Sequence, residues 1–205
     1  MPTDDAEIDP ERDLLERYED MVLIQIETIN GIDEKAASVS RLVGLLGGLV
    51  LTAVSVGSTV DLVELSEATA VAFSMLGAGI VALFVSLVLA IITYLSSKFR
   101  YGPAADMGEF VADYSLDRRE YRHVLLRMYS SVLRENKRVV DTNATRFKWC
   151  LTSLLAGLIF LFAAGILFVV PTAFEHEAVF GLIITGTVLG LTAYISREEY
   201  LTLDR

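Results

Sequence analysis

The residue types that usually carry chemistry are few in this chain and lie far apart. There are two histidines, His123 in a polar central region and His176 between two acidic residues. The run Glu175-His176-Glu177 offers three metal-binding side chains, but three adjacent residues on a helix cannot all face one ion. The sequence has no cysteine pair, glycine-rich phosphate loop or nucleophile elbow. We therefore expect no catalytic residue, metal site or cofactor, and a protein that is not an enzyme.

Four uncharged apolar stretches dominate the sequence, and they cover 42–60, 68–97, 149–174 and 178–196. Each is long enough to cross a hydrocarbon core about 30 Å thick, which takes about 20 helical residues. The connections 61–67 and 175–177 contain no Lys or Arg, so all 17 basic residues fall on one side. Because basic residues are retained in the cytoplasm, we predict a multi-pass protein of the cell membrane with both termini cytoplasmic.

The expected fold class is all-α, as one helical membrane domain over 1–205 with no sheet. Four transmembrane helices form two hairpins, and cytoplasmic stalk helices extend them. Asp9 and Pro10 suit a helix start, and Ser115 is a plausible cap for the second stalk. The expected segments are a stalk helix at 10–40, a hairpin at 42–97, a stalk helix at 104–148 and a hairpin at 149–196.

Both expected stalks carry apolar residues at alternating steps of three and four, which is typical of packed helices. The first stripe is Leu15, Tyr18, Val22, Ile29 and Ile32, interrupted by Gln25, and the second is Tyr121, Leu125, Met128, Val132 and Val139. Two readings stay open: an oligomerising coiled coil, or pairing of the two stalks within one chain, which we favour. Gly31 could end the first helix or only weaken it.

Small residues recur in the apolar stretches at the spacing of close helix packing. Gly44 and Gly48, and also Gly186 and Gly190, form GxxxG pairs. They can serve contacts within one chain or between copies. The apolar stretches contain no Asp, Glu, Lys, Arg or His, which weighs against proton pumps, ion-coupled transporters and voltage sensors. Cys150, the single cysteine, is expected to be a small buried residue.

The composition is acidic, with a net charge of −10 and thirteen Arg against four Lys. This balance favours a salt-adapted source such as a halophilic archaeon, because an acidic surface keeps a protein soluble where salt screens charge. The same acidity argues against nucleic acid as a partner, since phosphate binding needs a basic face.

Charged residues near the expected membrane edge give one specific hypothesis. Asp33 or Glu34 is predicted to face Arg138 or Arg146, so that an ion pair fixes the register of the two stalks. The alternative is a solvated charge run, because exposed pairs contribute about 0 to 1 kcal/mol.

The piece Asp33-Glu34-Lys35-Ala36, which precedes the first apolar stretch, resembles the D-x-K-A approach of Pycsar-effector and SLATT-type membrane proteins. The order of an amphipathic helix, a hairpin and a charged helix leading to another span is also similar. The resemblance covers roughly residues 12 to 170, and this chain departs from it by a fourth span and by the lack of a fused sensor domain. It implies an effector of prokaryotic antiviral defence that is activated by a nucleotide signal or a partner protein, assembles, and impairs the membrane.

We therefore expect a non-enzymatic integral membrane protein that forms homo-oligomers in the lipid bilayer and acts as an effector of antiviral defence. A cytoplasmic activator protein or nucleotide signal is the expected trigger. The alternatives are a small ion channel or pore, and a membrane scaffold that docks a soluble partner on its acidic N-terminal arm.

Overall fold

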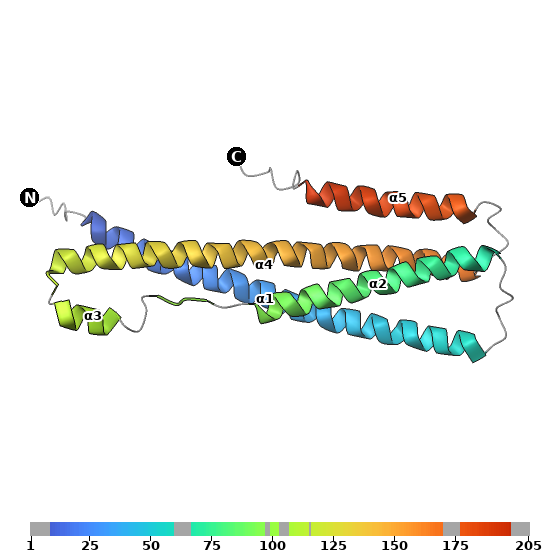
Figure 1. Ribbon diagram of the computed structural model, residues 1–205, viewed down its shortest axis with the longest axis horizontal. Coiled ribbons are helices and arrows are strands. Elements are labelled where there is room, and N and C mark those ends of the chain that lie inside the picture. Colours follow the sequence, from blue (N-terminus) through green and yellow to red (C-terminus); the bar gives the residue numbers. More distant parts are fainter. Residues whose placement is uncertain are drawn as a thin grey trace, which may run out of the picture. The chain divides into compact units, whose positions relative to one another are not determined.

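The computed structural model describes residues 9–59, 67–96, 99–102, 107–114, 116–169 and 177–197, and all regular structure among them is helical (Figure 1). The elements are α1 (Pro10–Thr59), α2 (Glu67–Leu95), α3 (Met107–Tyr114), α4 (Arg118–Val169) and α5 (Glu177–Ser196). Four of the helices, α1, α2, α4 and α5, are long and apolar enough to cross a membrane. For the described residues, the prediction of an all-helical fold with four such helices is confirmed, while the cytoplasmic position of the stalks stays a prediction.

The two longest helices begin with side chains that satisfy their first backbone N–H groups. Asp9 precedes α1, and its carboxylate accepts a hydrogen bond from the backbone N–H of Glu11. Pro10 then occupies the first helical position, where a missing N–H costs nothing. Before α4, the backbone N–H of Asp117 donates to the side chain of Glu120, which is half of a capping box. Ser115, the cap expected from the sequence, lies outside the described residues.

Neither α1 nor α4 is interrupted where its polar part meets its apolar part. Helix α1 is 50 residues long and passes through Gly31, so this glycine does not end the helix. Helix α4 is 52 residues long. The chain divides into two compact units: unit 1 is Met1–Glu34 with Leu95–Thr145, and unit 2 is Lys35–Tyr94 with Arg146–Arg205. Each long helix therefore contributes to both units.

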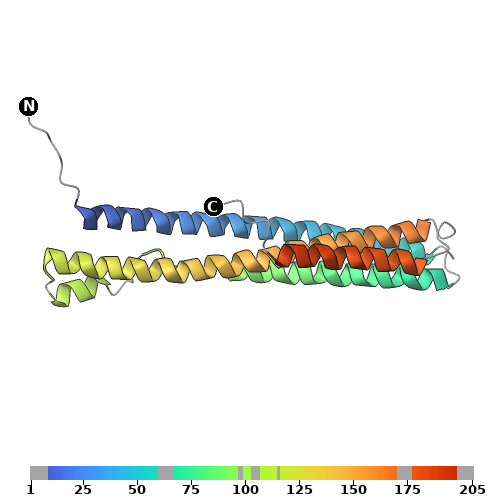
Figure 2. The same ribbon diagram turned by 90° about the horizontal axis from the view of Figure 1, so that it is seen from above.

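In unit 1, the first part of α1 and the first part of α4 run side by side in the same direction, and α3 lies beside the start of α4 (Figures 1 and 2). Val22 and Ile29 of α1 are buried, and so are Leu125 and Val132 of α4. Because the two buried residues are seven positions apart on each helix, they lie on one face of that helix.

In unit 2, α2 runs antiparallel to the second part of α4 (Figure 2). The core is made by α1, α2 and α4, and it consists of Val39, Val43, Leu83, Ala90, Cys150 and Leu154. Many other large apolar side chains of unit 2 are exposed, among them Leu45, Phe84, Phe162 and Leu182. Such an exposed apolar surface suits a lipid solvent better than water.

Candidate functional site

Polar side chains link α1 to α4 at three levels of unit 1. The guanidinium of Arg122 forms an ion pair with the carboxylate of Asp9. Further along, the hydroxyl of Tyr129 donates to Glu19 Oε1 over 3.2 Å. The side-chain amide of Gln25 donates to the backbone oxygen of Leu133 over 3.2 Å. The partner on α4 advances as the residue on α1 advances, so these bonds fix a parallel register.

Two of these contacts shift the pKa of a side chain. The hydrogen bond from Arg122 lowers the pKa of Asp9 below its usual value, since it stabilises the carboxylate. Burial raises the pKa of Tyr129, and the nearby negative charge of Glu19 raises it further. Both groups keep their ordinary protonation states near neutral pH, so their contacts act in packing and not in proton transfer.

Asn136 makes the most complete polar contact in unit 1. Its side chain is 1% exposed. The oxygen Oδ1 accepts from the backbone N–H of Arg100 over 3.3 Å, and Nδ2 donates to the backbone oxygen of the same residue over 3.0 Å. Arg100 belongs to no helix, so its backbone groups have no intrahelical partner. The amide of Asn136 supplies both partners and thereby fixes the segment that follows α2. The ion pair between Arg100 and Glu135, at 3.2 Å, lies beside this contact.

In unit 2, the close approach of α2 and α4 occurs at a pair of glycines. A Cβ placed on Gly157 would lie 2.9 Å from Cδ2 of Leu83 and 3.2 Å from the backbone oxygen of Gly79. A Cβ placed on Gly79 would lie 2.9 Å from Leu161 and 3.2 Å from the backbone oxygen of Gly157. The two glycines thus face each other, and the absence of both side chains permits the short distance between the backbones.

Ser86, seven residues after Gly79 in α2, contacts Cys150, seven residues before Gly157 in α4. The Ser86 hydroxyl donates to the backbone oxygen of Cys150 over 2.9 Å, and the Cys150 thiol donates to the backbone oxygen of Ser86 over 3.3 Å. Both side chains are fully buried. The step of seven on both helices shows that Gly79–Gly157 and Ser86–Cys150 belong to one antiparallel register.

The four glycines of the GxxxG pairs predicted from the sequence lie elsewhere. A Cβ placed on Gly44, Gly48, Gly186 or Gly190 meets no atom within 4 Å. Close packing at these positions is therefore not observed within the part of the chain that the structure describes. Contacts of these glycines between copies stay a prediction.

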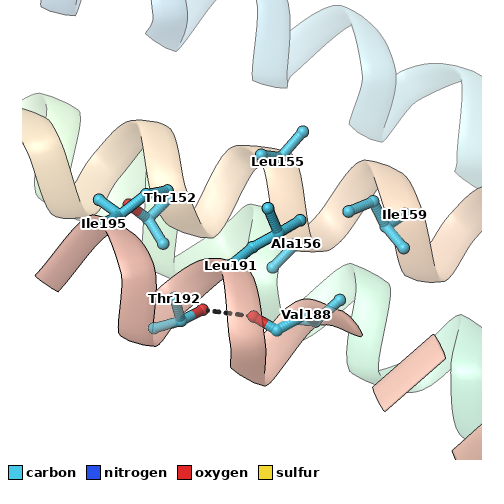
Figure 3. A pocket seen from close by; sticks show the side chains of 8 residues that line it. All are labelled: Thr152, Leu155, Ala156, Ile159, Val188, Leu191, Thr192 and Ile195. Atoms are coloured by element: carbon cyan, nitrogen blue, oxygen red, sulfur yellow. Dashed lines mark hydrogen bonds between the residues drawn. The ribbon is translucent and has the colours of Figure 1, made fainter. Parts of the chain in front are cut away.

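The hydroxyl groups of the apolar helices mostly bond their own backbone. Thr152 donates to the oxygen of Lys148, and Thr192 donates to the oxygen of Val188. These two residues line a hollow between α4 and α5 with a cavity volume of about 10 Å³ (Figure 3). Its other lining residues are Leu155, Ala156, Ile159, Val188, Leu191 and Ile195. Since one water needs roughly 10 to 15 Å³ and at least two polar partners, this hollow is no aqueous path.

The sequence-predicted stripe residues lie on α1 and α4 in unit 1 and differ in their degree of burial. The half-buried ones are Leu15, Tyr18, Gln25, Ile32, Met128 and Val139, while Tyr121 is exposed. Of the charged residues, Asp33 and Arg146 are half-buried, and Glu34, Lys35 and Arg138 are exposed. The ion pairing predicted among them stays a prediction, which a double-mutant cycle with Asp33→Asn and Arg138→Gln measures.

Among the described residues, no group of three or more His, Cys, Asp or Glu side chains could hold a metal ion. Glu175 and His176 lie outside the described residues. His123 is exposed, with its Nε2 3.7 Å from Glu11. The contacts that sequence reasoning missed are those of Asn136, Ser86 and Gly157. Comparison with protein-family models, with curated proteins and with solved structures finds no match to this chain.

Proposed function

We propose that the protein is a multi-pass membrane protein that acts by self-assembly and impairs the membrane when activated. The observation that carries this proposal is the small intrachain burial of two apolar helices. In the most apolar stretch of each helix, the buried share is only 11% in α1 and in α5, against 28% in α2 and 33% in α4. The remaining surface of α1 and α5 is open to lipid or to other copies of the chain.

A conducting path built by one chain receives no support from the described contacts. The hollow between α4 and α5 is apolar and holds at most about one water. A pore built from several copies needs surfaces that a single chain leaves open, and α1 and α5 have such surfaces. The resemblance carried by Asp33, Lys35 and Ala36 to membrane effectors of antiviral defence points in the same direction.

The proposed orientation places both termini and unit 1 in the cytoplasm. A membrane-impermeant thiol reagent applied to intact cells should label Glu64→Cys and His176→Cys. It should leave Glu7→Cys and Glu120→Cys unlabelled until the cells are opened, because the reagent cannot cross the bilayer. Labelling of Glu120→Cys from outside would overturn the orientation.

The activity is tested by induced expression in cells, followed with a dye that enters only through damaged membranes. We expect growth arrest together with dye entry when the activating signal is present. The purified protein in dye-loaded liposomes provides the parallel measurement. Ion flux in liposomes without any activator and without dye release would favour a small channel. A soluble protein that co-purifies in fixed ratio, without membrane damage, would favour a scaffold.

A further inference from the structure

Helix α1 changes the sign of its charge directly before its apolar part. Residues 10–34 carry eight acidic and two basic side chains, whereas residues 35–59 carry Lys35, Arg41 and no acidic side chain. Both cations are exposed. Neither forms an ion pair in the part of the chain that the structure describes. They are therefore available to an anion from outside the chain.

The two cations border one exposed apolar face of α1. Successive helical residues turn by about 100°, so Leu42, Leu45 and Leu49 fall within an arc of roughly 60°. These three residues, which we call the leucine face, are exposed, Leu45 at 74% and Leu49 at 68%. On the same scale, Lys35 and Arg41 lie just outside the two edges of the arc. Apolar surface and positive charge thus adjoin on one side of the helix.

The leucine face is separate from the side of α1 that packs in unit 2. Val39 and Val43 belong to the core, and they point roughly 90° and 130° away from the middle of the leucine face. The leucine face therefore contacts what surrounds the helix and not the core of unit 2.

The heights of these groups along α1 match the layers of a phospholipid. At about 1.5 Å per residue, Lys35 lies roughly 10 Å before Leu42, and Leu49 lies roughly 10 Å beyond it. The polar layer on each side of the hydrocarbon core is about 5 to 7 Å thick. Helical side chains tilt toward the N-terminus, which carries the guanidinium of Arg41 out of the apolar part. The long stem of Lys35 can extend toward the same layer, so both charges reach it.

The nearest acidic residue along the helix does not neutralise the two cations. Glu34 directly precedes Lys35, and neighbours in a helix point about 100° apart, so they do not face each other. Seven residues separate Glu34 from Arg41, which is roughly 10 Å along the axis. An ion pair needs its charged atoms within about 4 Å. The positive charge next to the leucine face is therefore retained.

We propose that α1 binds an anionic phospholipid, with the phosphate between Lys35 and Arg41 and an acyl chain along the leucine face. This inference rests on the proposed membrane location and names a ligand that the proposed self-assembly does not require. A second copy of the chain suits this face poorly, because Arg41 of one copy would lie beside Arg41 of the other in a parallel pair. A small soluble anion would leave the leucine face uncovered. An anionic phospholipid satisfies both the charged and the apolar part.

The lipids that the full-length protein retains test this proposal. The purified protein is equilibrated in mixed micelles with equal amounts of phosphatidylglycerol and phosphatidylcholine, and native mass spectrometry counts the bound lipids. We expect phosphatidylglycerol to be retained preferentially. Lys35→Gln and Arg41→Gln should each lower this preference about five-fold, since one basic side chain near a membrane surface contributes about 1 kcal/mol.

Two controls isolate the charge and the acyl chain. Arg127→Gln removes the same charge from an exposed residue of α4 that lies about 20 residues before the apolar stretch starting at Trp149, so it should leave the preference unchanged. Glycerol 3-phosphate carries the anionic group without acyl chains and should not displace the lipid. Displacement by this compound would show a site for soluble anions and would overturn the lipid as the ligand.

The remaining outcomes separate this inference from the proposed function. Equal retention of the two lipids, or a preference that survives both substitutions in α1, would overturn the site. Disulfide-linked dimers of Leu45→Cys in native membranes would assign the leucine face to a second copy and overturn it as well. A phosphatidylglycerol preference without dye release from liposomes would support the site and contradict membrane impairment. Protein that alkaline carbonate releases from membranes would overturn both.

Discussion

Replacing Gly157 by alanine tests whether α2 and α4 approach each other through their backbones. The added Cβ would lie 2.9 Å from Leu83 Cδ2 and 3.2 Å from the backbone oxygen of Gly79. The leucine can rotate away at modest cost, but the carbonyl of a packed helix cannot. The two helices must then separate by a few tenths of an ångström, and overpacking of this kind costs about 1 to 3 kcal/mol.

The gain in helix propensity works against this cost, so a matched control is needed. Replacing glycine by alanine inside a helix stabilises it by about 1 kcal/mol where space is available. Gly186→Ala, on α5, provides that situation because no atom lies within 4 Å of the added carbon. The free energy of unfolding should therefore be lower for Gly157→Ala than for Gly186→Ala by about 1 to 3 kcal/mol. For a chain of this size, the difference corresponds to roughly 2 to 12 °C in Tm.

Thermal unfolding in one detergent, followed by circular dichroism, measures the difference. Gly79→Ala should behave like Gly157→Ala, and the double variant should lose less than the two separate losses together, because either methyl group already opens the same contact. Equal Tm values for Gly157→Ala and Gly186→Ala would show that the two backbones are not in contact, and the register argued from these glycines would then be wrong.

Three further predictions address other contacts. Ile29→Asp should lower the free energy of unfolding by about 3 to 5 kcal/mol, since it buries an unpaired charge at a side chain that is 1% exposed, while Leu23→Asp should have almost no effect in the same melt. Ser86→Ala should cost about 0.6 kcal/mol and at most about 1.7, as hydrogen bonds between membrane helices do, and denaturant unfolding in mixed micelles would detect it. The ion pair with Arg122 lowers the pKa of Asp9 in the folded state, so it stabilises the fold at pH values above the unfolded pKa of Asp9, and this stability is lost as the pH falls through the folded pKa. Arg122→Gln should flatten this part of the pH–stability curve, and an unchanged curve would contradict the contact.

The helical elements could be predicted from the sequence because their signals are strong and local. Long apolar stretches without charge leave few alternatives to helices that cross a membrane. The start of α1 was also readable, since Asp9 and Pro10 form a common opening pair and the structure begins the helix at Pro10. The continuity of α1 was harder to judge, because Gly31 after Asn30 reads equally well as a stop signal. Apolar side chains at regular spacing on both sides of this glycine outweigh its cost of about 1 kcal/mol.

The contacts between the apolar helices of unit 2 could not be predicted, because spacing within one helix does not reveal which helix faces it. Gly44 and Gly48 fit the close-packing pattern and yet face no neighbour. Gly79 and Gly157 make the contact, although Gly157 has no partner glycine four residues away in its own helix. A GxxxG pair describes a smooth surface, whereas a contact needs two complementary surfaces in register.

A different signal on α4 would have found the missed residues. Tyr129, Asn136, Asn143, Cys150 and Gly157 follow one another at intervals of seven, so they share one face of the helix. How polar these side chains are depends on whether the backbone that they contact is already hydrogen-bonded within a helix. Asn136 binds Arg100, whose backbone groups lie outside any helix and need both a donor and an acceptor. Cys150 and Gly157 face α2, whose backbone is already hydrogen-bonded, so a small side chain or none suffices there.

The substitution Asn136→Gly should therefore release the segment around Arg100 without altering the Ser86–Cys150 contact. Hydrogen exchange of the Arg100 amide measures that release. Unchanged protection of this amide would show that the segment is held by contacts other than the Asn136 side chain.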